Sequence, residues 1–458
     1  MRKAPIPRRL SWILLAVCVT SMVYYHLAIF LPQARRARAA DGFGNGYSFG
    51  ADFYPIWLTA RQGLLHHSDP YTPDMTRQIQ IGLFVRSVSE SDIDAVDTLV
   101  SPNYRAFSYP AFVDILFWPV ALLPFSVVRI ALAPLLSILT AGSIPFWLRA
   151  FQLRARAPTL VFLALLALSS YAVLEGLYAE QLGLLVAFLL TASLGALARG
   201  RIFLSGSLFA LTFIKPQMVV LIAAYLFLWC VCDWRVRRRF VGGFFLMAVP
   251  LVVSSLLVWP AWISEWLRVL FAYREYSTPP LTWYLLGNRI GPRLGACLIA
   301  VFLLFALAIM LRARRADVSS LQFTLTVSLL LAITAVTLLP GHAVYDHVVL
   351  LPGIILIAFS WRKFALPSRP FRIVLALAAL ALFWQWILAP VMVFARLISS
   401  VPLSRNVIAL PIRTAASIPF AVLALLALML WRLHGKGLAL ENRFSREKLK
   451  SSALEDRI

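Results

Sequence analysis

A single carboxylate, Asp52, stands in the stretch "GADFYPIW", whose other residues are small, apolar or aromatic. The nearest acidic residues are Asp41 before it and Asp69 after it. Apolar neighbours would take Asp52 partly out of water, which makes a carboxylate a better proton acceptor. Such a carboxylate can remove the proton of a hydroxyl group, so Asp52 is a candidate general base. The stretch alone favours a plainer role, in which Asp52 caps the helix that "FYPIWLTARQGLL" predicts.

A lysine, Lys215, interrupts the long apolar run 202–232 at the tripeptide "KPQ". A charged amine inside a membrane costs several kcal/mol and usually has an anionic partner or a functional role. The alternative is that the long side chain reaches the membrane surface on its own. Near that surface the amine would lie close to the phosphate of any bound lipid, so Lys215 is a candidate phosphate-binding residue.

The segment "GHAVYDHVVLLP" carries two histidines, His342 and His347, with Asp346 between them. A spacing of five does not stack two ligands on one helix face, as a spacing of four would. The sequence contains no HExxH or similar metal-binding pattern, so no metal is predicted. As a bare motif, the segment is typical of a helix-capping turn. A position near Asp52 and Lys215 would instead make the histidines part of a shared site.

The composition indicates which kind of protein must position these residues. Of the 458 residues, 61% are hydrophobic and only 14% are charged, whereas a soluble domain has about a quarter charged. The net charge of +23 could suggest nucleic-acid binding. The basic residues instead fall mostly in short clusters between apolar runs, which is the pattern that orients membrane proteins. The four cysteines lie in or beside apolar runs, so no disulfide framework is predicted.

The apolar runs predict an all-α polytopic membrane protein with about twelve transmembrane helices. The first is "SWILLAVCVTSMVYYHLAIFL", which follows a basic start and precedes no cleavage site, so it is expected to be retained. Residues 1–433 form the predicted transmembrane domain, and residues 434–458 form a basic cytoplasmic tail. The further helices are expected near 126–148, 158–175, 182–198, 202–214, 217–232, 240–258, 293–311, 318–338, 347–361, 371–390 and 412–432.

Basic flanks predict that the run 202–232 is a hairpin. "ARGR" precedes the run and "WRVRRR" follows it, and both clusters favour the cytoplasmic side. "KPQ" would then be the hairpin tip on the outer side, and both chain termini would be cytoplasmic. The longer loops lie outside in this topology, above all the first extracytoplasmic loop, 32–108. The polar residues that fall on the outer side are Asp52, Tyr71, Glu175, Glu180, Gln181, Lys215, His342, Asp346 and His347.

Four segments, in order, resemble glycosyltransferase family 87, whose members use polyprenyl-phosphate sugars and belong to the GT-C class. The first is "DFYPIWLTARQGLLHHSDPY", and the second is "FSYPAFVDILFWPVALLP". The third is "EQLGLLVAFLL" followed by "GSLFALTFIKPQ", and the fourth is "LPGHAVYDHVVLLP". The resemblance implies a GT-C-type bundle. It also implies a hexosyltransferase that moves a sugar from a polyprenyl-phosphate donor to a lipid or glycan acceptor; the best-known members are mannosyltransferases.

The resemblance implies roles for single residues. Asp52 matches the acid of the first outer loop, the expected base of an inverting transfer, while Lys215 and His347 match polar positions facing the donor phosphate. Arg105 and Arg289 are further cations that could stabilise the departing phosphate. The remaining residues expected to bind donor or substrate are His342, Gln181 and Tyr71.

The expected setting is a multi-pass protein of the cell membrane (the inner or plasma membrane) with its active site on the extracytoplasmic side. No cofactor, metal or nucleic acid is expected, and an outward site without a glycine-rich phosphate loop argues against a nucleotide sugar. The rival functions are a transporter or lipid flippase, with Lys215 and His347 handling substrate or protons, and a non-catalytic scaffold. A transporter would favour matching broken helices in two halves, and the sequence shows one break and no internal repeat.

Overall fold

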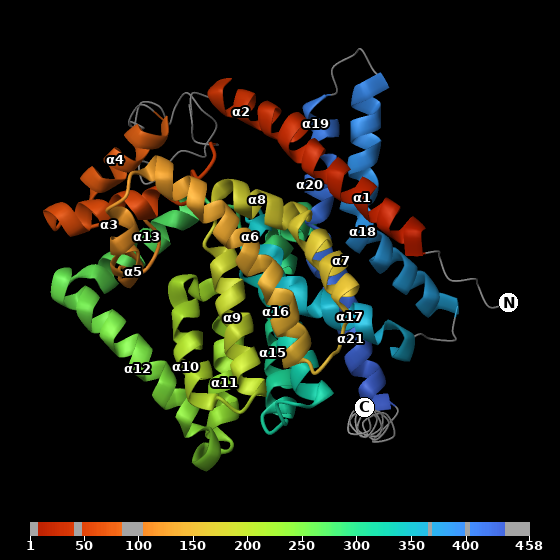
Figure 1. Ribbon diagram of the computed structural model, residues 1–458. Helices are drawn as coiled ribbons and strands as arrows, with labels where there is room; N and C mark the ends of the chain where they lie inside the picture. Colours follow the sequence, from red (N-terminus) through yellow and green to blue (C-terminus); the bar gives the residue numbers. More distant parts are fainter. Residues whose placement is uncertain (1–7, 41–47, 85–103, 365–368, 399–403, 436–458) are drawn as a thin grey trace.

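The computed structural model describes residues 8–40, 48–84, 104–364, 369–398 and 404–435. Its regular structure is helical throughout these ranges, apart from one β-bridge between Pro280 and Pro340. The predicted all-α class is therefore confirmed for the described part of the chain (Figure 1). The acidic stretch "SESDIDAVD" (residues 89–97) and nearly all of the predicted basic tail lie outside the described residues.

Six helical stretches in the described ranges are long and apolar enough to cross a membrane, or seven if one bent pair counts as a span. The first span joins three consecutive elements, and the last joins the final three elements of the described chain, of which the first two are short. The predicted number of about twelve stays a prediction. The six comprise α1 (Arg8–Tyr24) with η1 (Tyr25–Phe30) and α2 (Leu31–Ala40); α6 (Phe125–Ala150); α12 (Trp234–Val258); α15 (Pro292–Ala313); α18 (Arg369–Ile398); and α19 (Arg405–Ile408) with α20 (Leu410–Ala415) and α21 (Ile418–Gly435).

The other apolar helices are shorter than a full span. The segment expected as one helix at 158–175 forms two, which bend by 63° relative to each other. The second of them begins where the Ser170 side chain accepts a hydrogen bond from the Val173 amide, a standard helix cap. These shorter helices are α7 (Ala157–Leu168), α8 (Tyr171–Ala179), α9 (Gly183–Ala198), α10 (Ile202–Leu211), α11 (Val220–Val231), α16 (Leu321–Thr337) and α17 (Leu351–Phe364).

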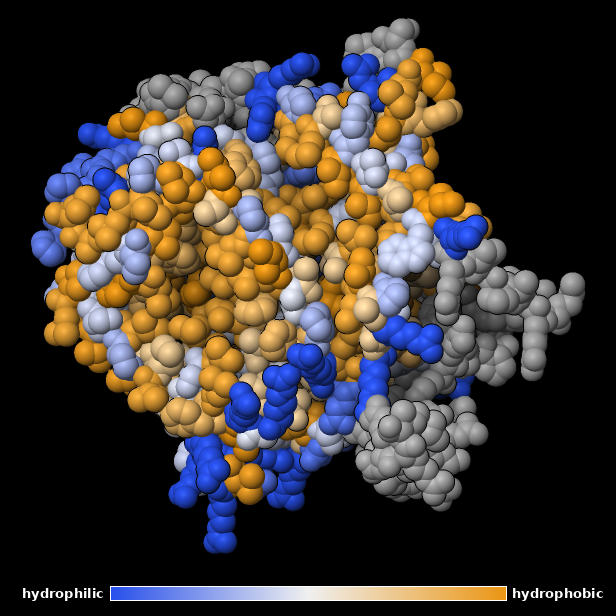
Figure 2. Space-filling view, viewed as in Figure 1, coloured by the Kyte–Doolittle hydropathy of each residue, from blue (hydrophilic) through white to orange (hydrophobic). Residues whose placement is uncertain are grey.

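The surface of the bundle is apolar over a broad area. Figure 2 shows hydrophobic residues across the middle of one face and hydrophilic residues toward its upper and lower ends. On α12, large apolar side chains such as Leu246 and Leu257 are exposed, with 79% of the Leu257 residue accessible. An apolar surface of this extent would be unstable in water. The chain is therefore a membrane protein whose outer helices face lipid.

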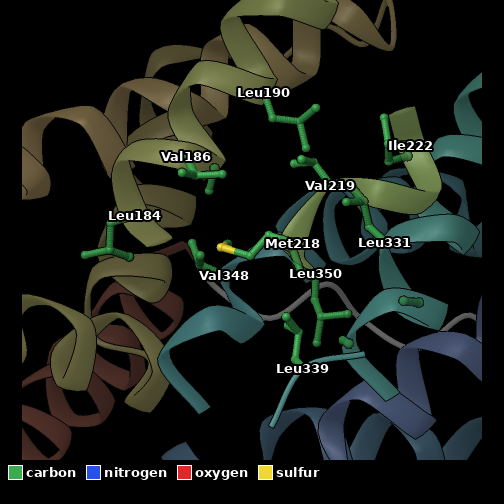
Figure 3. Packing of buried hydrophobic residues seen from close by; sticks show 14 of the residues in the cluster. Leu184, Val186, Leu190, Met218, Val219, Ile222, Leu331, Leu339, Val348 and Leu350 are labelled. Carbon is green, nitrogen blue, oxygen red and sulfur yellow. The ribbon is translucent and has the colours of Figure 1, made fainter. Parts of the chain in front are cut away.

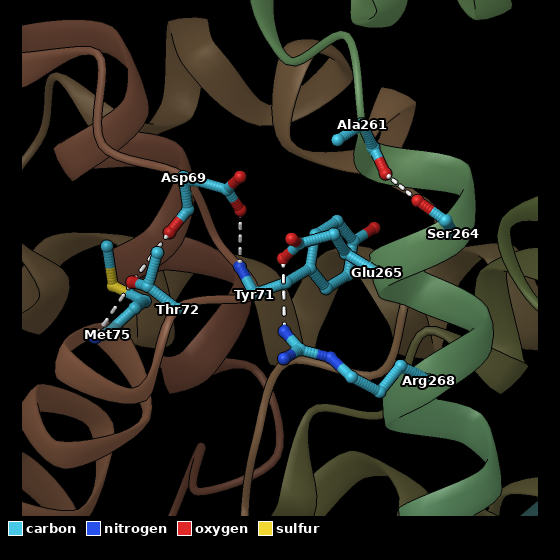
Figure 4. A network of polar contacts seen from close by, with 8 residues as sticks. All are labelled: Asp69, Tyr71, Thr72, Met75, Ala261, Ser264, Glu265 and Arg268. Carbon is cyan, nitrogen blue, oxygen red and sulfur yellow. Dashed lines mark hydrogen bonds and ion pairs between the residues drawn. The ribbon is translucent and has the colours of Figure 1, made fainter.

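The residues between the first and second long spans are not a simple loop. The described part of 32–108 contains α3 (Tyr54–His66) and α4 (Pro73–Phe84), and α5 (Phe112–Ala121) follows. The segment "SDPY" forms a turn between α3 and α4, in which Asp69 Oδ1 accepts a hydrogen bond from the Tyr71 amide at 2.8 Å (Figure 4). Thr72 Oγ1 then accepts from the Met75 amide and supports the start of α4. Beside this turn runs α13 (Trp262–Tyr276).

The run 202–232 doubles back on itself. A Cβ at Gly243 would overlap the carbonyl oxygen of Phe203, at the start of α10, while Arg237 donates a hydrogen bond to the carbonyl of Trp229, near the end of α11. Gly243 and Arg237 lie in the first half of α12, which packs against both arms (Figure 1). The start of α10 and the end of α11 therefore lie at the same end of α12. The chain reverses at Lys215, between the 3₁₀ turns η3 (Thr212–Ile214) and η4 (Pro216–Met218).

A tightly packed apolar cluster surrounds the hairpin tip. Met218 of η4 lies among side chains of α9, α16 and the 3₁₀ helix η6 (Val344–Leu350), including Leu184 and Val348 (Figure 3). Every residue of α16 from Phe323 onward is buried. Lipid is as apolar as leucine, so close van der Waals packing is what holds such helices together. This packing fixes the hairpin tip relative to η6.

Candidate functional site

Five polar side chains from five separate segments form one linked row. Arg105 Nη1 lies 2.6 Å from Asp52 Oδ1 as an ion pair, and Gln181 Nε2 donates a short hydrogen bond to the other oxygen, Oδ2. Lys215 Nζ donates to Gln181 Oε1 at 3.0 Å and to both oxygens of Asp346, at 2.7 and 3.0 Å. The row therefore alternates cation, carboxylate, amide, cation and carboxylate.

Asp52 is held by its backbone as well as by its carboxylate. Its amide donates to the carbonyl of Ala179 at 3.2 Å, and the Gly50 amide donates to the carbonyl of Tyr178 at 2.9 Å. The loop before α3 is thus fixed on the end of α8. Phe53, and not Asp52, is the N-cap of α3, and no side chain caps that helix. The plainer helix-capping role of Asp52 is therefore not what the structure shows.

Three residues with positive φ surround this carboxylate: Gly50 at 78°, Arg105 at 66° and Glu180 at 56°. A left-handed backbone costs a non-glycine residue about 1–3 kcal/mol and persists where the surroundings enforce it. At Glu180 it ends α8 and starts the turn that leads to Gln181. A Cβ at Gly50 would lie 2.8 Å from Glu180 Oε2, so any other residue there would also have to displace the Glu180 carboxylate.

Lys215 is buried, with 5% of the residue exposed. An ammonium group has three N–H donors, and the contacts to Gln181 and to the two Asp346 oxygens account for three hydrogen bonds. The Tyr345 ring centroid lies 5.2 Å from the same nitrogen. Because Lys215 can only donate, it requires the oxygen of the Gln181 amide to face it. The amide nitrogen of Gln181 must then point toward Asp52.

Asp346 is part of the linked row. The sequence pattern predicted the two histidines of the same segment as site residues, and not this carboxylate. It lies on η6 and is 1% exposed. Lys215 itself was the feature of the sequence that could have predicted Asp346, since a lysine buried in a membrane protein usually has an anionic partner. Removing either charge would leave the other buried and unpaired, which makes the pair essential to the local structure.

His347, the neighbour of Asp346, lines a cavity instead of joining the row. The cavity has a volume of about 450 Å³ and is mostly apolar. His347 is 6% exposed, and neither of its ring nitrogens has a hydrogen-bond partner within the described ranges. Ala358 also lines the cavity and is exposed, so the cavity reaches the surface. Helices α1, α7, α17 and α18 contribute most of the wall, through residues such as Leu14, Phe162, Leu351, Leu382 and Trp386.

The remaining predicted residues lie outside the linked row. His342 is exposed, and its Nδ1 lies 2.7 Å from Thr278 Oγ1. Arg289 is exposed on the short helix α14 (Asn288–Ile290), and none of the row's hydrogen bonds involves it. The hydroxyl of Tyr71 donates to the carbonyl of Tyr109 at 2.7 Å. In the described part of the chain, no group of three or more His, Cys, Asp and Glu residues is arranged to hold a metal ion.

Gly183 offers a direct test of how tightly the buried pair is enclosed. A Cβ at Gly183 would overlap Asp346 Oδ1 and lie 3.5 Å from Lys215 Nζ. We expect Gly183→Ala to lower the free energy of unfolding by about 1–3 kcal/mol, because the carboxylate must move away from the amine. Thermal unfolding in detergent measures the change.

The matched control for that substitution is Gly142→Ala on α6. A Cβ there would meet only Phe188, at an ordinary 3.9 Å. Alanine favours a helix interior over glycine by roughly 1 kcal/mol, so this variant should be neutral or slightly more stable. Equal free energies of unfolding for the two variants would contradict the close enclosure of the Lys215–Asp346 pair.

An all-helical bundle with an apolar surface and a row of linked charges inside it defines an integral membrane protein with a polar site. Residues 107–340 match the family model described as glycosyltransferase family 87. The match spans just over half of the 458 residues. The chain therefore belongs to glycosyltransferase family 87 and is a membrane glycosyltransferase, which confirms the resemblance seen in its motifs. No curated protein matches the sequence.

The family match and the polar row overlap only in part. Gln181 and Lys215 lie within residues 107–340, while Asp52, Arg105 and Asp346 lie outside that range. The hydrogen bonds of the folded chain join the two groups.

Proposed function

We propose that the protein transfers a hexose, with mannose the first sugar to test, from a polyprenyl-phosphate donor to a lipid or glycan acceptor. The transfer takes place at the outer face of the cell membrane, with both chain termini cytoplasmic, and it inverts the anomeric centre. The observation that carries the proposal is the pair of Asp52 and Arg105. Their side chains are 14% and 25% exposed, whereas Lys215 and Asp346 at the other end of the row are buried.

In the proposed reaction Asp52 is the base. The acceptor hydroxyl gives its proton to Asp52 while its oxygen bonds to the anomeric carbon of the sugar. On the opposite face, the bond between that carbon and the phosphate oxygen breaks, and its electron pair leaves with the lipid phosphate. Because the phosphate is already a good leaving group, one carboxylate is sufficient, unlike the two that most glycosidases use.

Arg105 is the cation best placed for the departing phosphate. Its planar guanidinium has five N–H donors and matches the geometry of phosphate oxygens. Donors aimed at a developing negative charge lower the barrier to its departure. Lys215 would act less directly: held by Asp346, it orients the Gln181 amide, and Gln181 in turn orients Asp52.

The cavity beside His347 supports a lipid-linked donor. Its apolar walls suit an isoprenoid chain, and its exposed edge at Ala358 lets such a chain enter from the membrane. His347 would supply a hydrogen bond to a polar group at the end of that chain. Adjacent residues of η6 would thus serve the two parts of the donor. Asp346 would support the phosphate side indirectly, through Lys215 and Gln181, and His347 would contact the lipid.

The proposal predicts a defined donor requirement. We expect purified protein in lipid nanodiscs to transfer mannose from a polyprenyl-phosphate mannose without a nucleotide sugar or added metal. Ala358→Trp should raise KM roughly tenfold for a long-chain donor and less for a short-chain donor, because the indole fills the cavity edge. The assay follows radiolabelled sugar in the acceptor product.

Leu257→Trp is the matched control, since Leu257 is exposed on α12 and does not line the cavity. This variant should leave KM unchanged for both donors. Turnover that requires a nucleotide sugar would contradict the proposed donor. Equal KM values for Ala358→Trp and the parent protein would remove the cavity from the proposal.

A further inference from the structure

We propose that the donor phosphate takes Arg105 away from Asp52, so that binding of the donor releases the base. The inference rests on the proposed function and concerns the regulation of that same site. It starts from the observation that the free site is already paired internally: Arg105 neutralises Asp52, and Lys215 neutralises Asp346.

The resting arrangement opposes proton transfer to Asp52. Oδ1 is 2.6 Å from the Arg105 guanidinium, and Oδ2 accepts from Gln181. The acceptor hydroxyl must therefore compete with two donors that already hold the two oxygens of the carboxylate. The acceptor could not be deprotonated efficiently until this pair is broken.

Of the two cations, Arg105 is the more exposed, and it is the one that we propose changes partners. The Lys215 side chain is 6% exposed, and its three donors are accounted for by Asp346 and Gln181. The Arg105 side chain is 25% exposed, carries five donors and stands on a residue with φ of 66°. Its guanidinium carbon also lies 5.6 Å from the ring centroid of Tyr104, which partly supports the charge.

Charge balance gives the exchange its direction. The two carboxylates and two cations of the row sum to no net charge. A phosphodiester donor brings one negative charge, for which Arg105 offers a bidentate partner. Asp52 then keeps its contact with Gln181, which Lys215 holds in place. Its negative charge is no longer paired with a cation. That state is suited to receive the acceptor's proton, so the donor should bind before the acceptor reacts.

A double-mutant binding cycle tests the exchange. The probe is farnesyl phosphate, and its affinity is measured by calorimetry with the detergent-purified full chain. Asp52→Asn should bind the probe roughly two- to tenfold more tightly than the parent protein, because the competing partner of Arg105 is weakened. Arg105→Gln should bind it more weakly. In the Arg105→Gln background, Asp52→Asn should give no further gain.

The cycle separates the exchange from a general charge effect. If Asp52→Asn tightens binding equally with and without Arg105, the gain comes from the lost negative charge alone, and the exchange is wrong. Unchanged affinity of Asp52→Asn also overturns it. If Arg105→Gln does not fold, Arg105→Lys replaces it: it keeps the charge, loses the planar fork and should show a smaller gain.

Further controls identify what is bound. Arg268→Gln removes an arginine from an exposed ion pair with Glu265 on α13 (Figure 4) and should leave probe affinity unchanged. Farnesol should bind without responding to Asp52→Asn, since it lacks the phosphate. Inorganic phosphate that binds as tightly as farnesyl phosphate would point to a free anion instead of a lipid. Sugar transfer by the parent protein is measured separately, so an inactive enzyme and a failed exchange are distinguishable.

Discussion

Asp52→Asn should fold normally and lose sugar transfer by roughly a hundredfold or more, the usual scale for losing a general base. Asparagine has the shape of aspartate, and its amide oxygen can still accept a hydrogen bond from one of the two donors, Arg105 or Gln181, so that one of the two contacts remains. It cannot accept a proton from the acceptor hydroxyl. Because Phe53 is the N-cap of α3, the substitution removes no helix cap. Initial rates with saturating donor and acceptor, together with thermal unfolding, measure both expectations.

Asp52→Glu is the informative companion variant. It keeps the carboxylate but moves it by one methylene, so it should retain more activity than the asparagine variant while altering the contact with Gln181. A well-folded Asp52→Asn protein with nearly full transferase activity would exclude Asp52 as the base. In that case the transporter and scaffold alternatives would again need to be considered.

Lys215→Met should lower the free energy of unfolding by about 3–5 kcal/mol, the range measured when one partner of a buried ion pair is removed. Methionine fills a similar volume, but it leaves the Asp346 carboxylate 1% exposed and without its cation. The Gln181 amide also loses the donor that fixes its orientation. Sugar-transfer activity should fall together with stability. Chemical or thermal unfolding in detergent measures how much stability is lost.

The double variant Lys215→Met with Asp346→Leu separates the two effects. It replaces a buried ion pair by apolar side chains, which is often neutral or stabilising. We therefore expect most of the lost stability to return while transfer stays low, because Gln181 still lacks its oriented contact. A double variant that is as unstable as the single one, or that regains full activity, would contradict the positioning role of Lys215.

Much of the helical framework follows from hydrophobic runs. The helix predicted at 126–148 is Phe125–Ala150, and that predicted at 293–311 is Pro292–Ala313. The segment 158–175 was predicted as one helix because its apolar residues are continuous. Two serines interrupt it, and Ser170 caps a second helix at a 63° bend. That cap is a local signal which the apolar pattern concealed.

Single residues of the candidate site could be predicted from the sequence, but the contacts that join them could not. A lone carboxylate, Asp52, and a lysine within an apolar run, Lys215, are conspicuous in any sequence. Their connection through Gln181 is a matter of two contacts between distant segments, which composition cannot indicate. Asp346 and His347 show the limit most clearly. They are neighbours in sequence, and only the geometry of η6 decides that one contacts Lys215 while the other lines the cavity.

Lys215 and Asp346 are separated by 131 positions in the chain. A ribosome therefore delivers the 202–232 hairpin to the membrane long before it delivers the carboxylate that neutralises the hairpin's charge. Until α12, α15 and α16 have been added and η6 follows, the ammonium has no buried acid to pair with, and a charge without a partner resists transfer into lipid. The innermost contact of the candidate site can thus form only after four of the six long spans in the described ranges have been made, so the order of translation delays assembly of the linked row.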